Sequence, residues 1–184
     1  GVQTCALPIS LDLIANLRRE KGRVIFHGTE IRIAMTPRVI AAIAKGGAPA
    51  TPNQARFHAE YCIALIAKGA DVITPDHSLR WAEYLKDPEI SGVMQAIKVS
   101  AAPELSHYYD CRIEIVAGSR TIATMSGNAP KGCPANPVTE DELIDKFAHL
   151  TSSRLARTAA AAYAARALAL EREPAIDWLA QDLR

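Results

Sequence analysis

The sequence predicts an α+β fold in which helices cover a small, at least partly antiparallel sheet. Three observations lead to this prediction: strand patterns occur before residue 131, two of them form a hairpin, and only helical patterns follow residue 139. Residues 132–138 between the two regions are rich in Gly and Pro, which interrupt regular structure. We therefore expect an α+β domain over 10–131, a return linker over 132–138 and helices of a second, all-helical domain over 139–184.

The strands follow from alternating apolar residues. Ile31, Ile33 and Met35 alternate with Arg32 and Ala34, as in a strand buried on one side. Residues 97–100 show a weaker form of the same alternation. Residues 111–125 read as a hairpin, because Gly118-Ser119 separates two alternating runs and Gly in the first loop position suits a type II′ turn.

The clearest helix prediction covers residues 51–69. Thr51 can cap it, Pro52 suits the first helical position, Gln54 completes a capping box and Gly69 marks the end. Further helices in this region are predicted at 11–19, at 78–85 and from Asp87 onwards.

The last region opens with a second capping box. Thr139 and Glu142 have the required spacing, and the acidic residues there favour the positive end of a helix dipole. Helices are predicted at 139–150, 156–170 and 173–183. Because their apolar faces have no evident partner in this chain, we expect them to belong to a larger helical body.

Length and composition are those of a soluble globular domain. The chain has 184 residues, of which 49% are hydrophobic and 22% are charged. A net charge of +1 provides no basic surface for nucleic acid or an anionic membrane. No stretch approaches the roughly 20 apolar residues of a membrane span. We therefore expect neither nucleic acid nor a membrane as a partner.

The cysteines indicate a reducing compartment. Cys5, Cys62, Cys111 and Cys133 are widely spaced and form no C-x-x-C pair. This pattern supports neither a disulfide framework nor a zinc site. We expect reduced thiols, no bound metal and a cytoplasmic location.

The first nine residues, GVQTCALPI, have a different interpretation. They resemble one reading frame of a widely used sequencing adapter, and they match neither a signal peptide nor a membrane segment. We expect Gly1 to Ile9 to be an artefact and the natural sequence to begin near Ser10.

Most catalytic motifs are absent, including dinucleotide, P-loop, nucleophile-elbow and zincin motifs. Asp76 and His77 are adjacent after Pro75, where such residues typically cap a turn. Residues 107–111, HYYDC, have metal-capable ends but no further ligands, so we interpret them as a surface turn.

One helix face carries the better candidate site. Gln54, His58 and Tyr61 follow spacings of four and three within the helix predicted at 51–69. The Tyr61 phenol can donate to a carboxylate or carry a proton. The alternative is a core tyrosine with its hydroxyl at the surface, and spacing alone favours that alternative.

Three segments resemble a known family. GCPANPVTEDELIDKF at 132–147, ARFHAEYCIAL at 55–65 and DPEISGVMQAIKV at 87–99 are similar to conserved elements of the MmgE/PrpD family, in the same order. The family includes 2-methylcitrate dehydratase, cis-aconitate decarboxylase and iminodisuccinate epimerase. The resemblance extends over essentially Ser10 to Arg184.

The resemblance implies a large helical domain interrupted by an α+β lid, with the active site between them. Residues 10–131 would form the lid, and the upstream helical domain, with the catalytic Asp and His residues, would be missing. Tyr61 is then a catalytic and substrate-binding residue. His58 replaces the family's usual Ser, and we expect it either to bind a substrate carboxylate or to fill space.

These implications define the expected function. The intact parent is expected to be a cofactor-independent lyase or isomerase of small polycarboxylates and a homodimer, and the chain itself is expected to be inactive. The alternative is a complete, non-enzymatic α+β binding module, which predicts a start codon close to Ser10.

Overall fold

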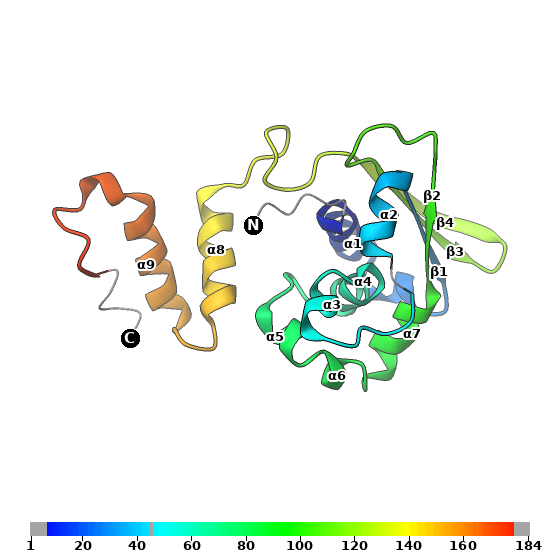
Figure 1. Ribbon diagram of the computed structural model, residues 1–184, viewed down its shortest axis with the longest axis horizontal. Coiled ribbons are helices and arrows are strands. Elements are labelled where there is room, and N and C mark those ends of the chain that lie inside the picture. Colours follow the sequence, from blue (N-terminus) through cyan, green and yellow to red (C-terminus); the bar gives the residue numbers. More distant parts are fainter. Residues whose placement is uncertain (1–6, 45, 179–184) are drawn as a thin grey trace. The chain divides into compact units, whose positions relative to one another are not determined.

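The computed structural model describes residues 7–44 and 46–178, and the chain forms two compact units, residues 1–137 and 138–184. The first unit is the predicted α+β fold, with one mixed four-stranded sheet (Figure 1). Its strands are β1 (Glu30–Met35), β2 (Ile97–Ala101), β3 (Cys111–Ala117) and β4 (Arg120–Gly127).

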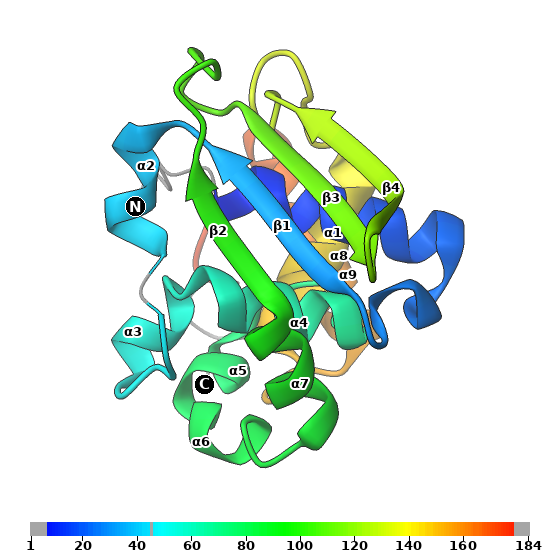
Figure 2. The same ribbon diagram turned by 90° about the vertical axis from the view of Figure 1, so that its right-hand side faces the viewer.

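The helices of the first unit pack mainly against one face of this sheet. They are α1 (Leu7–Lys21), η1 (Arg23–Phe26), α2 (Pro37–Ile43), α3 (Pro52–Arg56), α4 (Ala59–Lys68), α5 (Pro75–Leu79), α6 (Trp81–Tyr84) and α7 (Pro88–Ala96). Figure 2 shows the sheet from its open face, with α1 and α4 behind it.

The strand order is β2-β1-β3-β4, so β1 lies between two strands that follow much later in the chain. β1 pairs in parallel with β2 and antiparallel with β3, and β3 and β4 form the predicted hairpin. Gly118 has a φ of 59°, and Ser119 does not have a positive φ. This combination is that of the predicted type II′ turn.

The alternation of side chains explains why one face of the sheet is buried. Ile31, Ile33, Ile113 and Ile115 are all fully buried and form the centre of the core. Residues between them, such as Arg32 opposite Glu114, point to the other face and stay partly or fully exposed. Since side chains on a strand alternate between faces, a shift of one residue in register would bury these charges.

Helix α1 closes the core over β3 and β4. The ideal Cβ position of Gly127 in β4 lies 3.3 Å from Ile9 Cδ1 and 3.4 Å from Leu13, so the helix approaches the strand backbone closely. The helix begins at Leu7, before Ser10, where the natural sequence is predicted to begin. Leu7 and Ile9 are both buried.

The predicted helix at 51–69 is wrong as a continuous element. Helices α3 and α4 are separated at Phe57 and His58, and His58 has extended backbone angles. Thr51 accepts the Gln54 N–H as predicted, but the Gln54 side chain accepts from Ala50 N instead of completing the box. The helix predicted at 78–85 is likewise interrupted, at Arg80 between α5 and α6.

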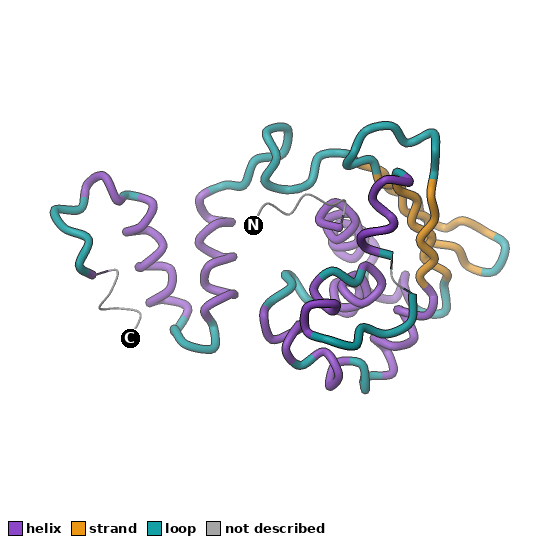
Figure 3. The backbone as a smooth tube through the Cα atoms, viewed as in Figure 1, coloured by secondary structure: helices purple, strands orange, loops and turns teal. Residues whose placement is uncertain are grey.

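The second unit contains a helical hairpin of α8 (Glu140–Thr151) and α9 (Arg157–Leu168), followed by η2 (Leu170–Arg172) (Figure 3). The capping box predicted from Thr139 and Glu142 is present. The helix predicted at 173–183 is wrong over residues 173–177, which form a loop after η2, and residues 179–183 lie outside the described residues.

Aromatic contacts hold the second unit together. The Phe147 and Tyr163 rings stack at 5.6 Å, and Tyr163 meets Trp178 edge-on at 4.9 Å. The Arg166 guanidinium lies 4.2 Å from the centre of the Trp178 ring. These contacts are needed because few other large side chains of this unit are buried.

Across the described residues, every helix is too short or too polar to cross a membrane.

Candidate functional site

The candidate site begins at the break between α3 and α4. His58 is the N-cap of α4, and its Nδ1 atom accepts the backbone N–H of Tyr61 at 3.4 Å. This cap replaces the predicted helical turn, because a capping residue needs extended backbone angles. Gln54, His58 and Tyr61 therefore do not share one helix face, as the predicted continuous helix would require.

His58 is buried, with 1% of its surface exposed. Its Nδ1 atom lies 3.1 Å from Glu60 Oε2, and the tautomer with its hydrogen on Nδ1 would donate a hydrogen bond to this carboxylate in place of the helix cap. In the capping state, His58 Nε2 and Glu60 Oε2 lack hydrogen-bond partners among the described residues. A buried polar atom without a partner costs free energy, so the arrangement of His58 and Glu60 at the start of α4 is not optimised for stability alone.

Glu60 stays charged despite its burial. Burial by itself raises the pKa of this carboxyl, but a hydrogen bond from His58, which Nδ1 donates only when it does not cap α4, and the backbone N–H groups of Glu60 and Gly46 together lower the pKa below its ordinary value of 4.5. A carboxylate therefore lies beside the imidazole at the start of α4.

Tyr61 has its ring in the core of the first unit. Its side chain is fully buried, and its hydroxyl donates a hydrogen bond of 2.7 Å to the carbonyl oxygen of His77. Burial raises the pKa of the Tyr61 phenol above its ordinary value of 10.0. The phenol is therefore neutral at physiological pH, where it can act as a hydrogen-bond donor but not as a base.

The acceptor of that bond belongs to a capped helical turn. The His77 Nδ1 atom lies 2.9 Å from both the backbone N and the hydroxyl of Thr74, which precedes α5. The turn interpretation of Asp76 and His77 is confirmed, since both lie in the first turn of α5. The spacing T-x-x-H is the sequence signal for the cap, with His in place of the usual Glu or Gln.

Helix α6 supports the same turn from the outside. The Tyr84 ring lies 4.9 Å from the His77 ring, and its hydroxyl donates to Asp76 at 2.7 Å. Arg80 pairs with Asp76 and Glu83. Burial lowers the pKa of His77, opposed by the charge of Asp76. Sequence reasoning missed Tyr84, because no local pattern connects it to Tyr61.

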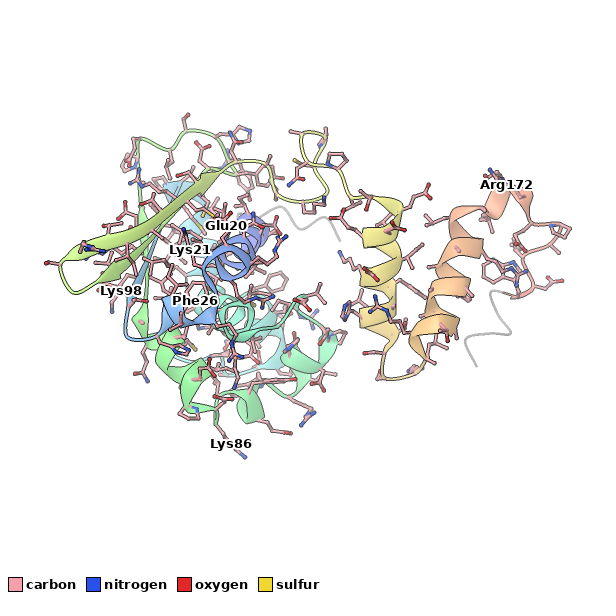
Figure 4. The ribbon with its side chains drawn as sticks, turned by 180° about the vertical axis from the view of Figure 1, so that it is seen from behind. Glu20, Lys21, Phe26, Lys86, Lys98 and Arg172 are labelled. Carbon is pink, nitrogen blue, oxygen red and sulfur yellow. The ribbon has the colours of Figure 1, made fainter. Side chains whose placement is uncertain are left out.

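A separate groove of about 530 Å³ lies between α7 and the turn before β1. Its walls include Phe26, which is buried, and Lys98, which is exposed (Figure 4). Neither His58 nor Tyr61 lines this groove. This groove is therefore separate from the α4 and α5 junction, where the residues predicted from sequence lie.

The segment HYYDC is a surface turn, as predicted. The Asp110 carboxylate accepts the His107 N–H at 2.8 Å, and His107 Nδ1 accepts the Tyr109 N–H at 3.3 Å. No group of three or more metal-capable side chains occurs within the described part of the chain.

Comparison with known proteins identifies the larger context of these residues. The family model for the MmgE/PrpD C-terminal domain matches residues 8–172, which cover most of both units and the whole α4 and α5 junction. No match is found among the curated proteins.

Proposed function

Since the chain belongs to the MmgE/PrpD family, we propose that it supplies one wall of the active site of a cofactor-independent lyase or isomerase acting on small polycarboxylates. The family match over residues 8–172 is the observation that carries this proposal. We further propose that the parent is a cytoplasmic homodimer.

Tyr61 is the residue of this wall to which we assign a direct role. Its neutral phenol can donate one hydrogen bond to a substrate carboxylate, and burial of its ring fixes the direction of that bond. In the present structure the hydrogen is given to the His77 carbonyl. Substrate binding therefore requires the phenol to exchange one acceptor for another.

The reaction class follows from the substrate. Elimination, decarboxylation and epimerisation of polycarboxylates all build negative charge next to a carboxylate, and a fixed donor stabilises that charge. A general base and a general acid are needed besides Tyr61. We propose that they belong to the helical domain of the parent, outside this chain, so that the 184-residue chain by itself is inactive.

His58 is the second residue of the proposed wall. Its unpartnered Nε2 atom is a possible donor to a substrate carboxylate, provided that the α3 and α4 junction opens to expose it. The alternative role, filling space beside α4, predicts that replacing it changes stability and leaves the Michaelis constant unchanged.

The test uses the uninterrupted gene product and three substrates: 2-methylcitrate, cis-aconitate and iminodisuccinate. We expect turnover of one of them, and Tyr61→Phe is expected to lower kcat at least about 100-fold without unfolding the protein. Lys86→Ala, at an exposed position after α6 (Figure 4), is the control. Turnover by the 184-residue chain alone, or unchanged kcat in Tyr61→Phe, would contradict the proposal.

A further inference from the structure

One hydrogen atom connects Tyr61 to α5. A phenol has a single hydrogen to donate, and Tyr61 gives it to the His77 carbonyl at 2.7 Å. The position of that carbonyl therefore determines where the hydroxyl hydrogen of the buried ring points and how easily that hydrogen passes to another acceptor.

The same residue also holds its own helix turn in place. The His77 Nδ1 atom accepts the Thr74 N–H at 2.9 Å, which satisfies one of the free donors at the start of α5. The Tyr84 ring, 4.9 Å away, covers the imidazole. The side chain of His77 thus fixes the turn whose backbone carbonyl fixes Tyr61.

We propose that His77 is a positioning residue for Tyr61: its neutral imidazole closes the first turn of α5 and so sets the carbonyl that orients the phenol. This inference rests on the proposed function only in assigning Tyr61 a role toward substrate. The hydrogen bond between the Tyr61 hydroxyl and the His77 carbonyl forms within this chain, so it can be measured without any substrate.

The proposal requires the neutral form of the imidazole. Nδ1 accepts the Thr74 N–H only when it carries no hydrogen, and a protonated ring can donate to the Thr74 hydroxyl but leaves the Thr74 N–H without its acceptor. Protonation of His77 therefore removes the cap and loosens the turn beneath Tyr61.

Several charged groups surround this ring and set the pH at which the change occurs. They are Asp76 on α5 and Tyr84 on α6, with Arg80 and Glu83 joined to Asp76 through ion pairs. Burial lowers the pKa of His77 below its ordinary value of 6.5, against the opposing charge of Asp76. The cap is therefore intact at neutral pH. It is lost when the pH falls below the lowered pKa of His77.

The experiment compares two replacements of His77 in the 184-residue chain. His77→Asn keeps an acceptor, Oδ1, at the position of Nδ1 but cannot be protonated, whereas His77→Ala removes the acceptor. Tyrosines carry ¹³C at Cζ, and the Tyr61 signal is assigned by its absence in Tyr61→Phe. His107→Ala, in the surface turn before β3, is the matched control.

At about pH 7.5 we expect His77→Asn and His107→Ala to keep the wild-type Tyr61 signal. His77→Ala is expected to shift that signal and to exchange the Thr74 amide hydrogen about five- to tenfold faster. As the pH is lowered to about 5, the wild-type signal should move to the His77→Ala position, while that of His77→Asn should stay.

Two results would overturn the proposal: a wild-type Tyr61 signal in folded His77→Ala, or identical pH profiles in wild type and His77→Asn. If His77→Ala does not fold, the comparison of wild type with His77→Asn decides alone. Because no substrate is used, failure of the proposed lyase or isomerase activity would leave this result standing.

Discussion

The Tyr61 hydroxyl and the His77 carbonyl oxygen, sixteen residues apart in sequence, are joined by a hydrogen bond of 2.7 Å. The bond ties α4, in the core, to the short helix α5 at the surface. Because the Tyr61 ring is fully buried while α5 is largely exposed, a movement of α5 changes the surroundings of the phenol more than its position. The predictions below start from this bond and from the other contacts that hold α4.

Removal of the Tyr61 hydroxyl is expected to weaken the fold only modestly. Tyr61→Phe keeps the ring in the core and deletes one hydrogen bond, so we expect the free energy of unfolding to fall by about 1 kcal/mol. Urea denaturation followed by circular dichroism measures this change. A loss above about 3 kcal/mol would mean that the hydroxyl is mainly structural and would weaken its assignment to substrate.

Arg18 is expected to be a major support of α4. Its guanidinium donates to the carbonyl oxygens of Ile66 at 2.6 Å and Ala70 at 2.9 Å, and it pairs with Asp71 at 2.7 Å. Arg18→Ala removes this side-chain donor from both carbonyls and leaves Ile66 with only the backbone N–H of Gly69, so we expect a loss of about 2 kcal/mol in urea denaturation.

The matched control for Arg18 is Asp71→Ala. The Asp71 side chain is 73% exposed, and an exposed ion pair contributes at most about 1 kcal/mol. Equal losses in the two variants would show that the ion pair, and not the capping of α4, accounts for the effect of Arg18.

The helix cap at His58 is tested by two smaller replacements, of which one retains a capping acceptor. Asn places an acceptor where His58 has Nδ1, and Ala does not. We expect His58→Asn to be more stable than His58→Ala by about 1 kcal/mol in thermal or urea unfolding. Equal stability would argue against the cap at 3.4 Å as the reason for the break before α4.

Thiol reactivity is expected to separate Cys111 from Cys133. Burial raises the pKa of the Cys111 thiol to about 12, while Cys133 is partly exposed in the loop before the second unit. Since the thiolate is the reactive form, we expect a maleimide at about pH 8 to modify Cys133 at least about 100-fold faster. Peptide mapping by mass spectrometry resolves the two sites, and comparable rates would contradict the buried position of Cys111.

The elements predicted from sequence are those defined by local chemistry. The alternation at Ile31, Ile33 and Met35 identified β1, Gly118-Ser119 identified the hairpin, and the Thr139 to Glu142 spacing identified the start of α8. In each case, residues a few positions apart determine the backbone conformation, so a single sequence suffices.

The elements that were missed depend on distant or competing contacts. Helix α2 carries Pro37 directly after a Thr but has no strong periodic pattern, so it was not predicted. The break at His58 reflects a cap made by an imidazole, which is a less common capping group than Ser, Thr, Asp or Asn. The contact between Tyr61 and His77 joins separate helices, and helical spacing cannot reveal it.

The central position of β1 also bears on how the chain is made. β1 is synthesised before both of its neighbours, β2 and β3, which come from residues 97–117. As the nascent chain leaves the ribosome, the backbone N–H and C=O groups along both edges of β1 have no partner until most of the first unit has emerged. Protection of that strand during translation, by the neighbouring helices or by a chaperone, is a requirement of this topology.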